Sequence, residues 1–219
     1  MDFETVDIIF RSRQTLLNIL KSKGYNVKPY LKFGPFEIET MLAGAGASKE
    51  TALRMELESE VETEGVLPKC RVEYAFSIKN RINSFLKKLI EDEDGNISID
   101  PDETSVIVIT LDPIGESFNK AALSAWNTNK LRISFFDANT IVNNPLDHVL
   151  VPKHELFPYS KHAEFMKEKY ISSKNTLPII KFHEDIIARI LGLVPGDIVK
   201  ITRPSPQAGL CETYRICTV

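Results

Sequence analysis

A short, continuously apolar run at residues 105–111, Ser-Val-Ile-Val-Ile-Thr-Leu, constrains the fold of this chain most strongly. Such a run is typical of a strand that is covered on both faces. Apolar and polar residues alternate from Cys70 onward, which predicts a half-buried strand, and residues 132–136 predict a further strand. Between these strands, residues 79–90 and 117–126 have the apolar spacing of helices. Strands that alternate with helices pair in parallel through crossovers, so we expect a small, mainly parallel α/β domain.

The chain before this α/β pattern begins with a predicted amphipathic helix at residues 2–23. Asp2 is placed to cap its start, and Gly24 occupies the position of a left-handed C-cap. The acidic stretch 48–63 is also expected to be helical. The Gly-rich residues 41–47 lack the Gly-Lys-Ser/Thr ending of a phosphate-binding loop.

The tripeptide Asn143-Asn144-Pro145 predicts a domain boundary. We therefore expect an N-terminal domain over 1–145 and a smaller α+β domain over 146–219. In the second domain, residues 160–170 and 184–192 have helical spacing. A glycine at the end of the second helix is a suitable C-cap.

A turn and two strands are predicted for the end of the chain. Val194-Pro195-Gly196-Asp197 fits a type II turn, with Pro at the second position and Gly where a positive φ is required. Residues 198–202 and 210–218 then have strand character. The segment between them is too long for a two-residue hairpin turn, and its two prolines restrict its flexibility.

Composition indicates a soluble globular protein in a reducing compartment. Hydrophobic residues make up 43% and charged residues 26% of the 219 residues, and no apolar run approaches the ~18 residues of a membrane span. The first residues lack the features of a signal peptide. Three cysteines cannot all pair within one chain, which favours the cytosol or nucleus.

The charge of the chain is unevenly distributed. From residue 146 onward there are 10 Lys/Arg and 8 Asp/Glu, whereas residues 1–145 contain 17 and 22. Neither part has the basic footprint of a protein that holds duplex DNA alone. Any contact with DNA is therefore expected to be local and shared with a partner that supplies the positive field.

An ordered series of short motifs in the last part of the chain resembles a known family. The motifs are Leu150-Val151-Pro152-Lys153-His154-Glu155, Leu177-Pro178-Ile179-Ile180, Leu191 to Ile201, Arg203-Pro204-Ser205, Ala208-Gly209 and Tyr214-Arg215. Their order and spacing resemble the assembly domain of the fifth subunit of eukaryotic-type DNA-directed RNA polymerases, a family with archaeal members. The resemblance implies a structural subunit that is not an enzyme by itself and that needs no cofactor.

The family places this domain as a wedge against the largest polymerase subunit, so the resemblance implies a partner interface here. The expected interface residues are Leu150, Val151, Pro152, His154, Val199, Ile201, Arg203, Pro204, Ser205, Gly209, Tyr214 and Arg215. Arg203 and Arg215 offer forked donors to partner carboxylates or carbonyls, or else brace their own loop. His154 and Glu155 resemble the family's His-Glu pair, and a structural, hydrogen-bonding histidine is favoured because no nucleophile accompanies the pair.

Two positions depart from the family pattern. The family usually has Asp-Pro where this chain has Asp185-Ile186, and Thr where this chain has Gln207. Proline in a first helical turn is replaceable, and Gln can still donate and accept hydrogen bonds. The fold is therefore expected to be retained.

The first domain is similar to the N-terminal jaw of the eukaryotic relatives, which the archaeal members of the family lack. The similarity includes the starting helix with Arg11, Arg13 and Gly24-Tyr25, and the α/β order that follows. It implies a eukaryotic nuclear polymerase or that of a large DNA virus, and hence the nucleus, or a virion or cytoplasmic replication site. Other polymerase subunits are implied partners, and neither a membrane nor a homo-oligomer is expected.

The relatives place a turn near downstream DNA after the apolar strand. Here Ser117, Asn119 and Lys120 are the candidates for weak phosphate contacts without base readout. Asp112 and Glu116 would repel phosphate, and a solvated helix start is the alternative interpretation.

Other site types receive less support. Residues 91–97 fail as a calcium loop because Ile90 and Pro101 occupy ligand positions, which leaves a solvated acidic loop. The His and Cys residues lack zinc spacings, so no metal is expected. Asp102 and Glu103 precede the apolar strand, but no Glu-x-Lys follows within the next strand, which weakens a magnesium-dependent nuclease. A free-standing DNA-binding module is the remaining alternative.

Overall fold

The computed structural model describes residues 3–44, 49–90, 99–207 and 209–219, and these residues form two compact units. Unit 1 consists of residues 1–62 and 66–144, and unit 2 of residues 63–65 and 145–219. Each unit combines a mixed β-sheet with helices, which agrees with the expected two-region α/β architecture. The predicted cap at Asp2 and the acidic loop at 91–97 lie outside the described residues.

The sheet of unit 1 has the strand order β1-β2-β3-β4. Its strands are β1 (Met55–Glu58), β2 (Lys69–Tyr74), β3 (Thr104–Thr110) and β4 (Ile133–Asp137). Strands β2, β3 and β4 are parallel, and β1 is antiparallel to β2. The parallel connections run through α4 (Ile82–Ile90) and α5 (Glu116–Asn129), as the alternation of strand and helix patterns predicts.

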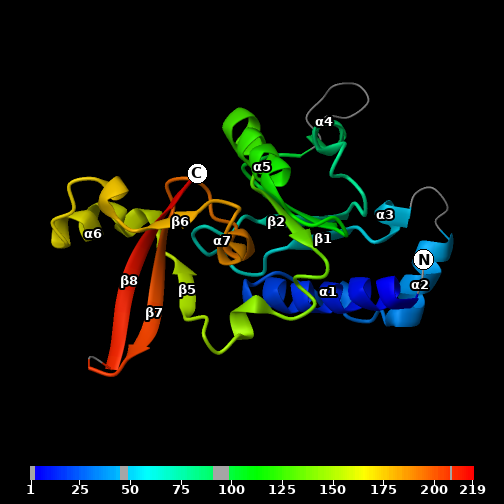
Figure 1. The fold of residues 1–219 in the computed structure, drawn as a ribbon, viewed down its shortest axis with the longest axis horizontal. Coiled ribbons are helices and arrows are strands. Elements are labelled where there is room, and N and C mark those ends of the chain that lie inside the picture. The colour runs from blue at the N-terminus through cyan, green and yellow to red at the C-terminus, as the bar shows by residue number, and fades with distance from the viewer. Residues whose placement is uncertain (1–2, 45–48, 91–98, 208) are drawn as a thin grey trace. The chain divides into compact units, whose positions relative to one another are not determined.

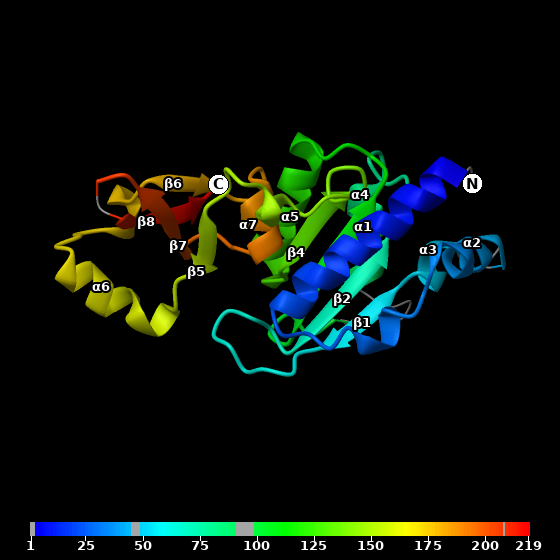
Figure 2. The ribbon, with the colours of Figure 1, turned by 90° about the horizontal axis from the view of Figure 1, so that it is seen from below.

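Helices cover both faces of this sheet, which explains the continuous apolar run in β3. Helix α1 (Phe3–Ser22) lies along one face, while α4 and α5 lie on the other (Figures 1 and 2). Helix α5 is anchored by an edge-to-face contact between the rings of Phe118 and Phe135, 5.3 Å apart, and both side chains are fully buried. Each such buried ring contributes roughly 1.5–3 kcal/mol. The C-cap predicted for α1 is present, because Gly24 has φ +95°.

The prediction of a helix over 48–63 is wrong. Helix α3 (Lys49–Ala52) makes only one turn, and β1 follows it. In β1 the buried Met55 and Leu57 alternate with the exposed Glu56 and Glu58. This period of two is a strand signal, but four residues in an acidic, helix-favouring context are too few to override the helical interpretation. A second helix before it, α2 (Pro35–Gly44), was not predicted either.

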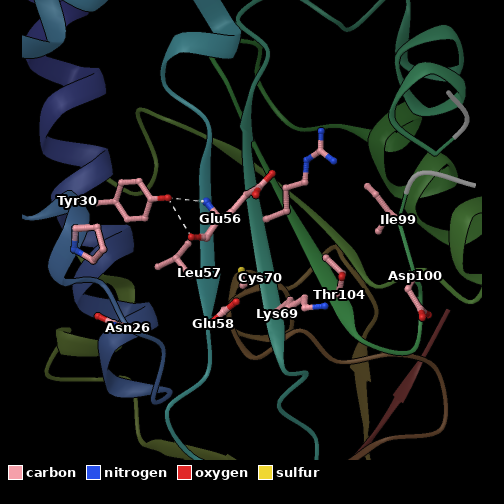
Figure 3. Close-up of a pocket in the computed structure, with 12 residues that line it drawn as sticks. Asn26, Tyr30, Glu56, Leu57, Glu58, Lys69, Cys70, Ile99, Asp100 and Thr104 are labelled. Atoms are coloured by element: carbon pink, nitrogen blue, oxygen red, sulfur yellow. Dashed lines mark hydrogen bonds between the residues drawn. The ribbon is translucent and has the colours of Figure 1, made fainter. Parts of the chain in front are cut away.

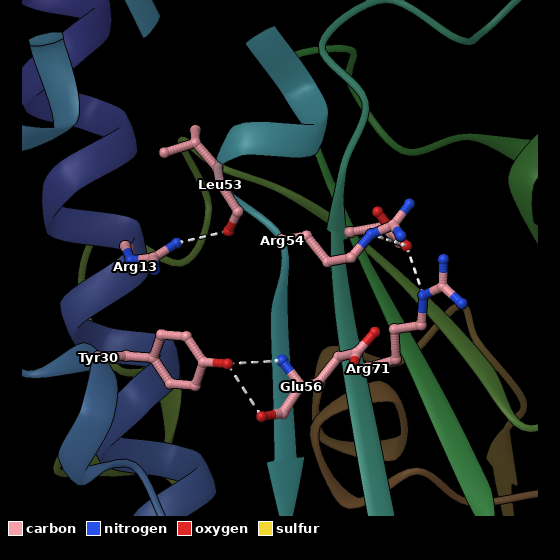
Figure 4. Close-up of polar contacts among 7 residues, drawn as sticks. Arg13, Tyr30, Leu53, Arg54, Glu56 and Arg71 are labelled. Atoms are coloured by element: carbon pink, nitrogen blue, oxygen red, sulfur yellow. Dashed lines mark hydrogen bonds and ion pairs between the residues drawn. The ribbon is translucent and has the colours of Figure 1, made fainter. Parts of the chain in front are cut away.

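The outer edge of β1 is closed by Tyr30, which follows from the short helical turn η1 (Lys28–Tyr30). Its hydroxyl donates to the Glu56 carbonyl and accepts from the Glu56 amide, both at 3.0 Å. Beside it, the buried Arg13 of α1 donates to the Leu53 carbonyl at 2.8 Å (Figure 4). The Arg13 guanidinium also lies near the rings of Tyr30 and Tyr74. Arg13 therefore fixes α1 to β1 and β2 and does not reach a nucleic-acid partner.

Unit 2 contains a second mixed sheet with the order β5-β7-β8-β6. Its strands are β5 (Lys153–Leu156), β6 (Ile179–Lys181), β7 (Ile198–Ser205) and β8 (Gly209–Thr218). Strand β7 pairs antiparallel with β5 and β8, and β6 pairs parallel with β8. The helices are α6 (His162–Glu168) and α7 (Ile186–Leu191), with the short turns η3 (Pro145–Asp147), η4 (Tyr159–Lys161) and η5 (Lys174–Thr176).

The hairpin of β7 and β8 extends further than predicted. Strand β7 continues to Ser205, which pairs with Gly209, so that only residues 206–208 connect the strands. Pro204 is tolerated in β7 because β5 pairs only as far as Thr202. Beyond Thr202, the side of β7 that faces away from β8 has no partner strand among the described residues. The missing N–H of Pro204 therefore removes no hydrogen bond between strands there.

Unit 2 also includes three residues from an earlier part of the chain, Thr63–Gly65. The Glu64 carboxylate accepts hydrogen bonds from the amide and the hydroxyl of Ser160, each at 2.8 Å, and these bonds lower its pKa. Gly65 has φ +89°, and a Cβ there would overlap the Leu156 side chain. Glycine is therefore required for this segment to approach β5.

The described residues contain no helix that is both long and apolar enough to span a membrane. All three cysteines are free thiols. Burial raises the pKa of Cys70 to about 11 and that of Cys217 to about 12, which makes both thiols poor nucleophiles.

Candidate partner interface and DNA-proximal loop

The turn that leads into β7 is held by a buried carboxylate. Gly196 has φ +99°, and the Asp197 amide donates to the Val194 carbonyl at 3.1 Å, as a type II turn requires. The side chain of Asp197 is 1% exposed and accepts from the Val194 amide at 2.9 Å and from the Tyr159 hydroxyl at 2.5 Å. The turn is joined to β8 because the Gly196 amide donates to the Cys217 carbonyl at 2.9 Å.

Helix α7, which precedes this turn, is capped at both ends. The Asp185 carboxylate accepts from the amides of Ile187 at 2.7 Å and Ala188 at 3.4 Å. Asp185 is thus a sufficient N-cap, which explains why the usual proline is not needed after it. Gly192 closes the helix with φ +71°, as predicted.

An aromatic cluster joins the segment after β5 to α6 and β8 in unit 2. The ring of Phe157 lies 5.4 Å from that of Tyr214 and 5.2 Å from that of Phe165, and it stacks on His162 at 5.8 Å. Nε2 of His162 donates to the Phe157 carbonyl at 3.1 Å, and Nδ1 accepts from the Lys174 ammonium at 2.9 Å. Burial, and then the positive charge of Lys174, lower the pKa of His162, so the ring is neutral at physiological pH.

The expected interface residues divide into surface and core positions. Val199 and Ile201 are 0% and 6% exposed, and their side chains belong to the core of unit 2. Leu150 is 81% exposed, whereas Val151 and Pro152 are half-buried. Of the remaining expected residues, Arg203, Pro204, Gly209 and Arg215 are exposed, and His154, Ser205 and Tyr214 are half-buried. The surface members therefore lie on the loop before β5, in β5 itself and along the β7–β8 hairpin.

The two arginines of this set differ in their surroundings. The guanidinium of Arg215 donates to the Ile179 carbonyl of β6 at 2.9 Å, so it braces its own unit. Arg203 is exposed, and its side chain makes no hydrogen bond to the described residues. His154 donates through Nδ1 to the Pro152 carbonyl at 2.7 Å, which fits the structural role favoured from the sequence.

Unit 2 also exposes apolar side chains that the sequence analysis did not select. Val149 is 93% exposed, Tyr170 is 96% exposed, Leu210 is 70% exposed and Ile179 is 51% exposed. Tyr170 follows the C-cap of α6 with φ +54°, a conformation that is unfavourable for a bulky residue. Isolated exposed apolar residues are common, whereas apolar residues that form one contiguous patch are typical of a protein-binding surface.

In unit 1, the loop before α5 differs electrostatically from the expectation. The Asp112 carboxylate accepts from the amides of Ile78 and Lys79 at 2.8 and 2.9 Å, and these donors partly offset its charge. Glu116 forms an ion pair with Lys120 at 2.7 Å, which lowers the pKa of Glu116. The side chain of Lys120 is therefore paired within α5. The exposed Lys79 lies beside this loop because its backbone amide donates to Asp112.

The predicted helix-start residues lie together at the first turn of α5. Ser117 is exposed and Asn119 is half-buried. Lys79 was missed by sequence reasoning because it is 33 residues away from Asp112 along the chain. Only the parallel pairing of β2 and β3 brings the ends of these strands together.

The acidic residues considered for nuclease chemistry lie at the opposite, amino-terminal edge of the sheet. Glu103 pairs with Lys69 at 2.7 Å, and both are exposed. Within the part of the chain that the structure describes, no group of three or more His, Cys, Asp or Glu residues is arranged to hold a metal ion.

Comparison with known proteins identifies the family of this chain. Residues 143–217 match the family model described as RNA polymerase Rpb5, C-terminal domain. The chain is 46% identical over 71 residues to DNA-directed RNA polymerase subunit Rpo5 of Methanosarcina barkeri, a match that covers 32% of this chain and 88% of the relative. It is 49% identical over 70 residues to the Rpo5 subunit of Archaeoglobus fulgidus, covering 32% of this chain and 90% of the relative.

A eukaryotic relative matches a longer part of the chain. The protein of Dictyostelium discoideum named DNA-directed RNA polymerases I, II, and III subunit rpabc1 is 37% identical over 101 residues, or 46% of this chain and 50% of the relative. The family model covers residues 143–217, which include most of unit 2 with the Val194–Asp197 turn, the capped α7 and the β7–β8 hairpin. The chain therefore belongs to the Rpb5/Rpo5 family of DNA-directed RNA polymerase subunits.

Proposed function

We propose that this chain is a non-catalytic structural subunit of a multisubunit DNA-directed RNA polymerase. The observation that carries the proposal is the match of residues 143–217 to the family of the fifth subunit, together with near-complete coverage of archaeal relatives. The catalytic chemistry then belongs to other subunits, and this chain contributes binding surface. The proposed location is the nucleus or another site of transcription, including a virion or cytoplasmic replication site if the polymerase is viral.

Within this proposal, unit 2 acts as the assembly domain and docks on the largest subunit. The exposed apolar residues Val149, Leu150 and Leu210 and the unengaged Arg203 support this role, because apolar anchors and arginine are enriched at protein interfaces. The buried Val199 and Ile201 serve the interface indirectly by fixing the sheet from which the anchors project.

Charged substitutions at these anchors test the docking proposal. A chain with both Leu150→Asp and Leu210→Asp is expected to retain its fold. The amount of the largest subunit that co-purifies with it is expected to fall at least about tenfold, since interface anchors often contribute about 1–2 kcal/mol or more each. The measurement is affinity purification of the tagged full-length chain at native abundance, followed by quantitative mass spectrometry.

A matched control is available in unit 1. Phe36 is 75% exposed, so Phe36→Asp introduces the same change on the surface of the other unit and is expected to leave co-purification unchanged. If the unmodified chain brings down no large polymerase subunit, the whole proposal fails. An equal loss with Phe36→Asp would refute the assignment of docking to unit 2.

Unit 1 is proposed to form part of a jaw near downstream DNA, with contacts to backbone phosphates through the complex. Ser117 and Asn119 remain candidates, and we add Lys79, whose backbone is bonded to Asp112 beside them. Because Lys120 is paired with Glu116, it contributes less than the sequence suggests.

The assembled polymerase can distinguish these two lysines. Lys79→Gln is expected to weaken cross-linking to downstream duplex DNA and to lower the salt dependence of binding by about one counterion, as for the loss of one phosphate contact. Lys120→Gln is expected to have little effect. A larger effect of Lys120→Gln than of Lys79→Gln would contradict the proposed arrangement.

A further inference from the structure

Two arginines in unit 1 share one oxygen of a buried carboxylate. Nε of Arg54 lies 2.7 Å and Nε of Arg71 lies 2.6 Å from Oε1 of Glu73. The Glu73 side chain is 6% exposed, whereas those of Arg54 and Arg71 are 36% and 17% exposed. The three side chains form a fixed group at the surface of the β1–β2 ladder, on the face opposite the buried Met55 and Leu57.

The strand register produces this group. Arg71 and Glu73 are two residues apart in β2, so they lie on the same face of the sheet. Met55 pairs with Val72 in the antiparallel ladder, which places Arg54 directly across from Glu73. Cross-strand neighbours of opposite charge attract each other, and here one carboxylate orients two guanidinium groups at once.

The arrangement leaves a net positive charge and unused donors. Arg71 donates a hydrogen bond to Glu73 through Nε, and Nε of Arg54 forms an ion pair with the same oxygen. Among the described residues, the terminal nitrogens of the two arginines make no hydrogen bond. Figure 4 shows the Arg71 guanidinium turned away from the carboxylate of Glu56, which lies opposite it in the ladder. The side chains of Arg54 and Arg71 are partly exposed, so their terminal nitrogens reach the surface and can donate to an added anion.

A hollow lies beside Arg71, whereas Arg54 is not part of its lining. It has a volume of about 720 Å³, and Arg71 and Lys69 of β2 line it together with Thr104 of β3. Figure 3 shows Glu56 and Glu58 on its β1 side and Asp100 at its far side. The volume is in the range of pockets that hold a small group or a short side-chain segment. The lining thus combines basic and acidic groups.

We propose that Arg54 and Arg71 form a clamp for the phosphate of a phosphoserine or phosphothreonine in a basic peptide segment of a partner protein. Glu73 holds both guanidinium groups in place, and their terminal nitrogens donate to the phosphate oxygens. Glu56 and Glu58 receive the basic side chains that flank the phosphorylated residue. This site goes beyond the proposed function, because it lies in unit 1 and requires neither docking of unit 2 nor contact with DNA.

The chemistry favours phosphate over carboxylate. A phosphate monoester carries a charge of about −1.5 to −2 and three acceptor oxygens, which can bond to two guanidinium forks at once. A carboxylate has two oxygens and one charge, and Glu73 already supplies one such group. Arginine also provides the planar fork that matches phosphate geometry, which lysine does not.

The lining also argues against a polyanion. The exposed carboxylates of Glu56, Glu58 and Asp100 would repel the successive phosphates of a nucleic acid. A single phosphate with cationic neighbours suits the same surface, since it meets the two arginines while its neighbours meet the carboxylates. The charge pattern therefore selects one phosphorylated residue in a basic context.

Binding of labelled peptides to the full-length chain tests this clamp. The probes are short peptides of glycine, alanine and lysine with a central phosphoserine or phosphothreonine, and the same peptides without phosphate. Fluorescence anisotropy is expected to show binding of the phosphorylated forms only. Arg54→Gln and Arg71→Gln are each expected to lower the affinity at least about tenfold, because each removes charge-assisted hydrogen bonds to the phosphate.

Two further variants separate recognition from folding. Arg71→Lys retains the charge beside Glu73 and hence the fold, but it removes the fork, and it is expected to weaken binding of the phosphopeptides. Arg81→Gln is the matched control, because Arg81 is an exposed arginine after β2 that bonds only weakly to the Ser77 carbonyl, at 3.4 Å. It is expected to bind like the unmodified chain, and circular dichroism should show the same fold for all variants.

Three results would overturn the proposal. The first is that neither phosphopeptide binds, or that the unphosphorylated peptides bind equally well. The second is that Arg81→Gln weakens binding as much as Arg71→Gln. The third is that inorganic phosphate or duplex DNA displaces the phosphopeptide at equal concentration, which would indicate a simple anion site or a nucleic-acid surface.

Discussion

Replacing Asp197 with alanine is expected to destabilise unit 2 by about 3 kcal/mol, because it leaves buried donors without acceptors. The Asp197 carboxylate accepts from the Val194 amide and from the Tyr159 hydroxyl. Its side chain is 1% exposed, so water cannot replace it without opening the structure. The same substitution releases the turn that aligns β7 with β8, and the loss should therefore extend to both strands.

Hydrogen exchange is a suitable measurement, since it resolves the two units. The amides of Ile198 to Ile201 and of Cys217 are expected to lose protection in the Asp197→Ala variant, while those of β3 in unit 1 keep it. Asp147→Ala is the matched control, because Asp147 is exposed in the turn η3. Equal protection of β7 in both variants would show that the buried carboxylate does not hold the turn.

The periodicity of apolar residues predicts those helices and strands that are long enough to repeat the pattern. The apolar run in β3 and the helical spacing of α4 and α5 predict the parallel part of the first sheet, which the structure contains. Strands β5 and β6 have four and three residues, too few to show a period of two. Strand β1 was mistaken for a helix for the same reason, and its pairing with β2 decides its conformation.

The candidate site was only partly predictable, because its electrostatics depend on register. Sequence order identified the Val194–Asp197 turn and the hairpin after it, since turn chemistry is local. It could not show that Val199 is fully buried or that Asp112 is bonded to amides of a loop 33 and 34 residues earlier. The pairing of Arg54 with Glu73 likewise depends on which residues face each other across two strands.

Lowering the pH from about 7.5 to about 5 is expected to destabilise unit 2 by roughly 2 kcal/mol through His183. His183 is 2% exposed in the turn after β6, and burial, aided by the charge of Arg189, lowers its pKa to about 3. In the unfolded chain the same group has a pKa near 6.5, so between about pH 6.5 and pH 3 the unfolded state binds more protons than the folded state. Stability is therefore complete above about pH 6.5 and falls as the pH drops through this window.

Urea unfolding at the two pH values, followed by hydrogen exchange in unit 2, measures this effect. His183→Asn is the informative variant, because His183 has φ +58° and asparagine tolerates that left-handed conformation better than most residues. The variant cannot take up a proton at this position, so most of its pH dependence should be lost. A residual dependence of the same sign is expected from His162, whose pKa burial also lowers. His148→Gln, at an exposed histidine, should behave like the unmodified chain, and an undiminished loss of stability in His183→Asn would exclude His183 as the cause.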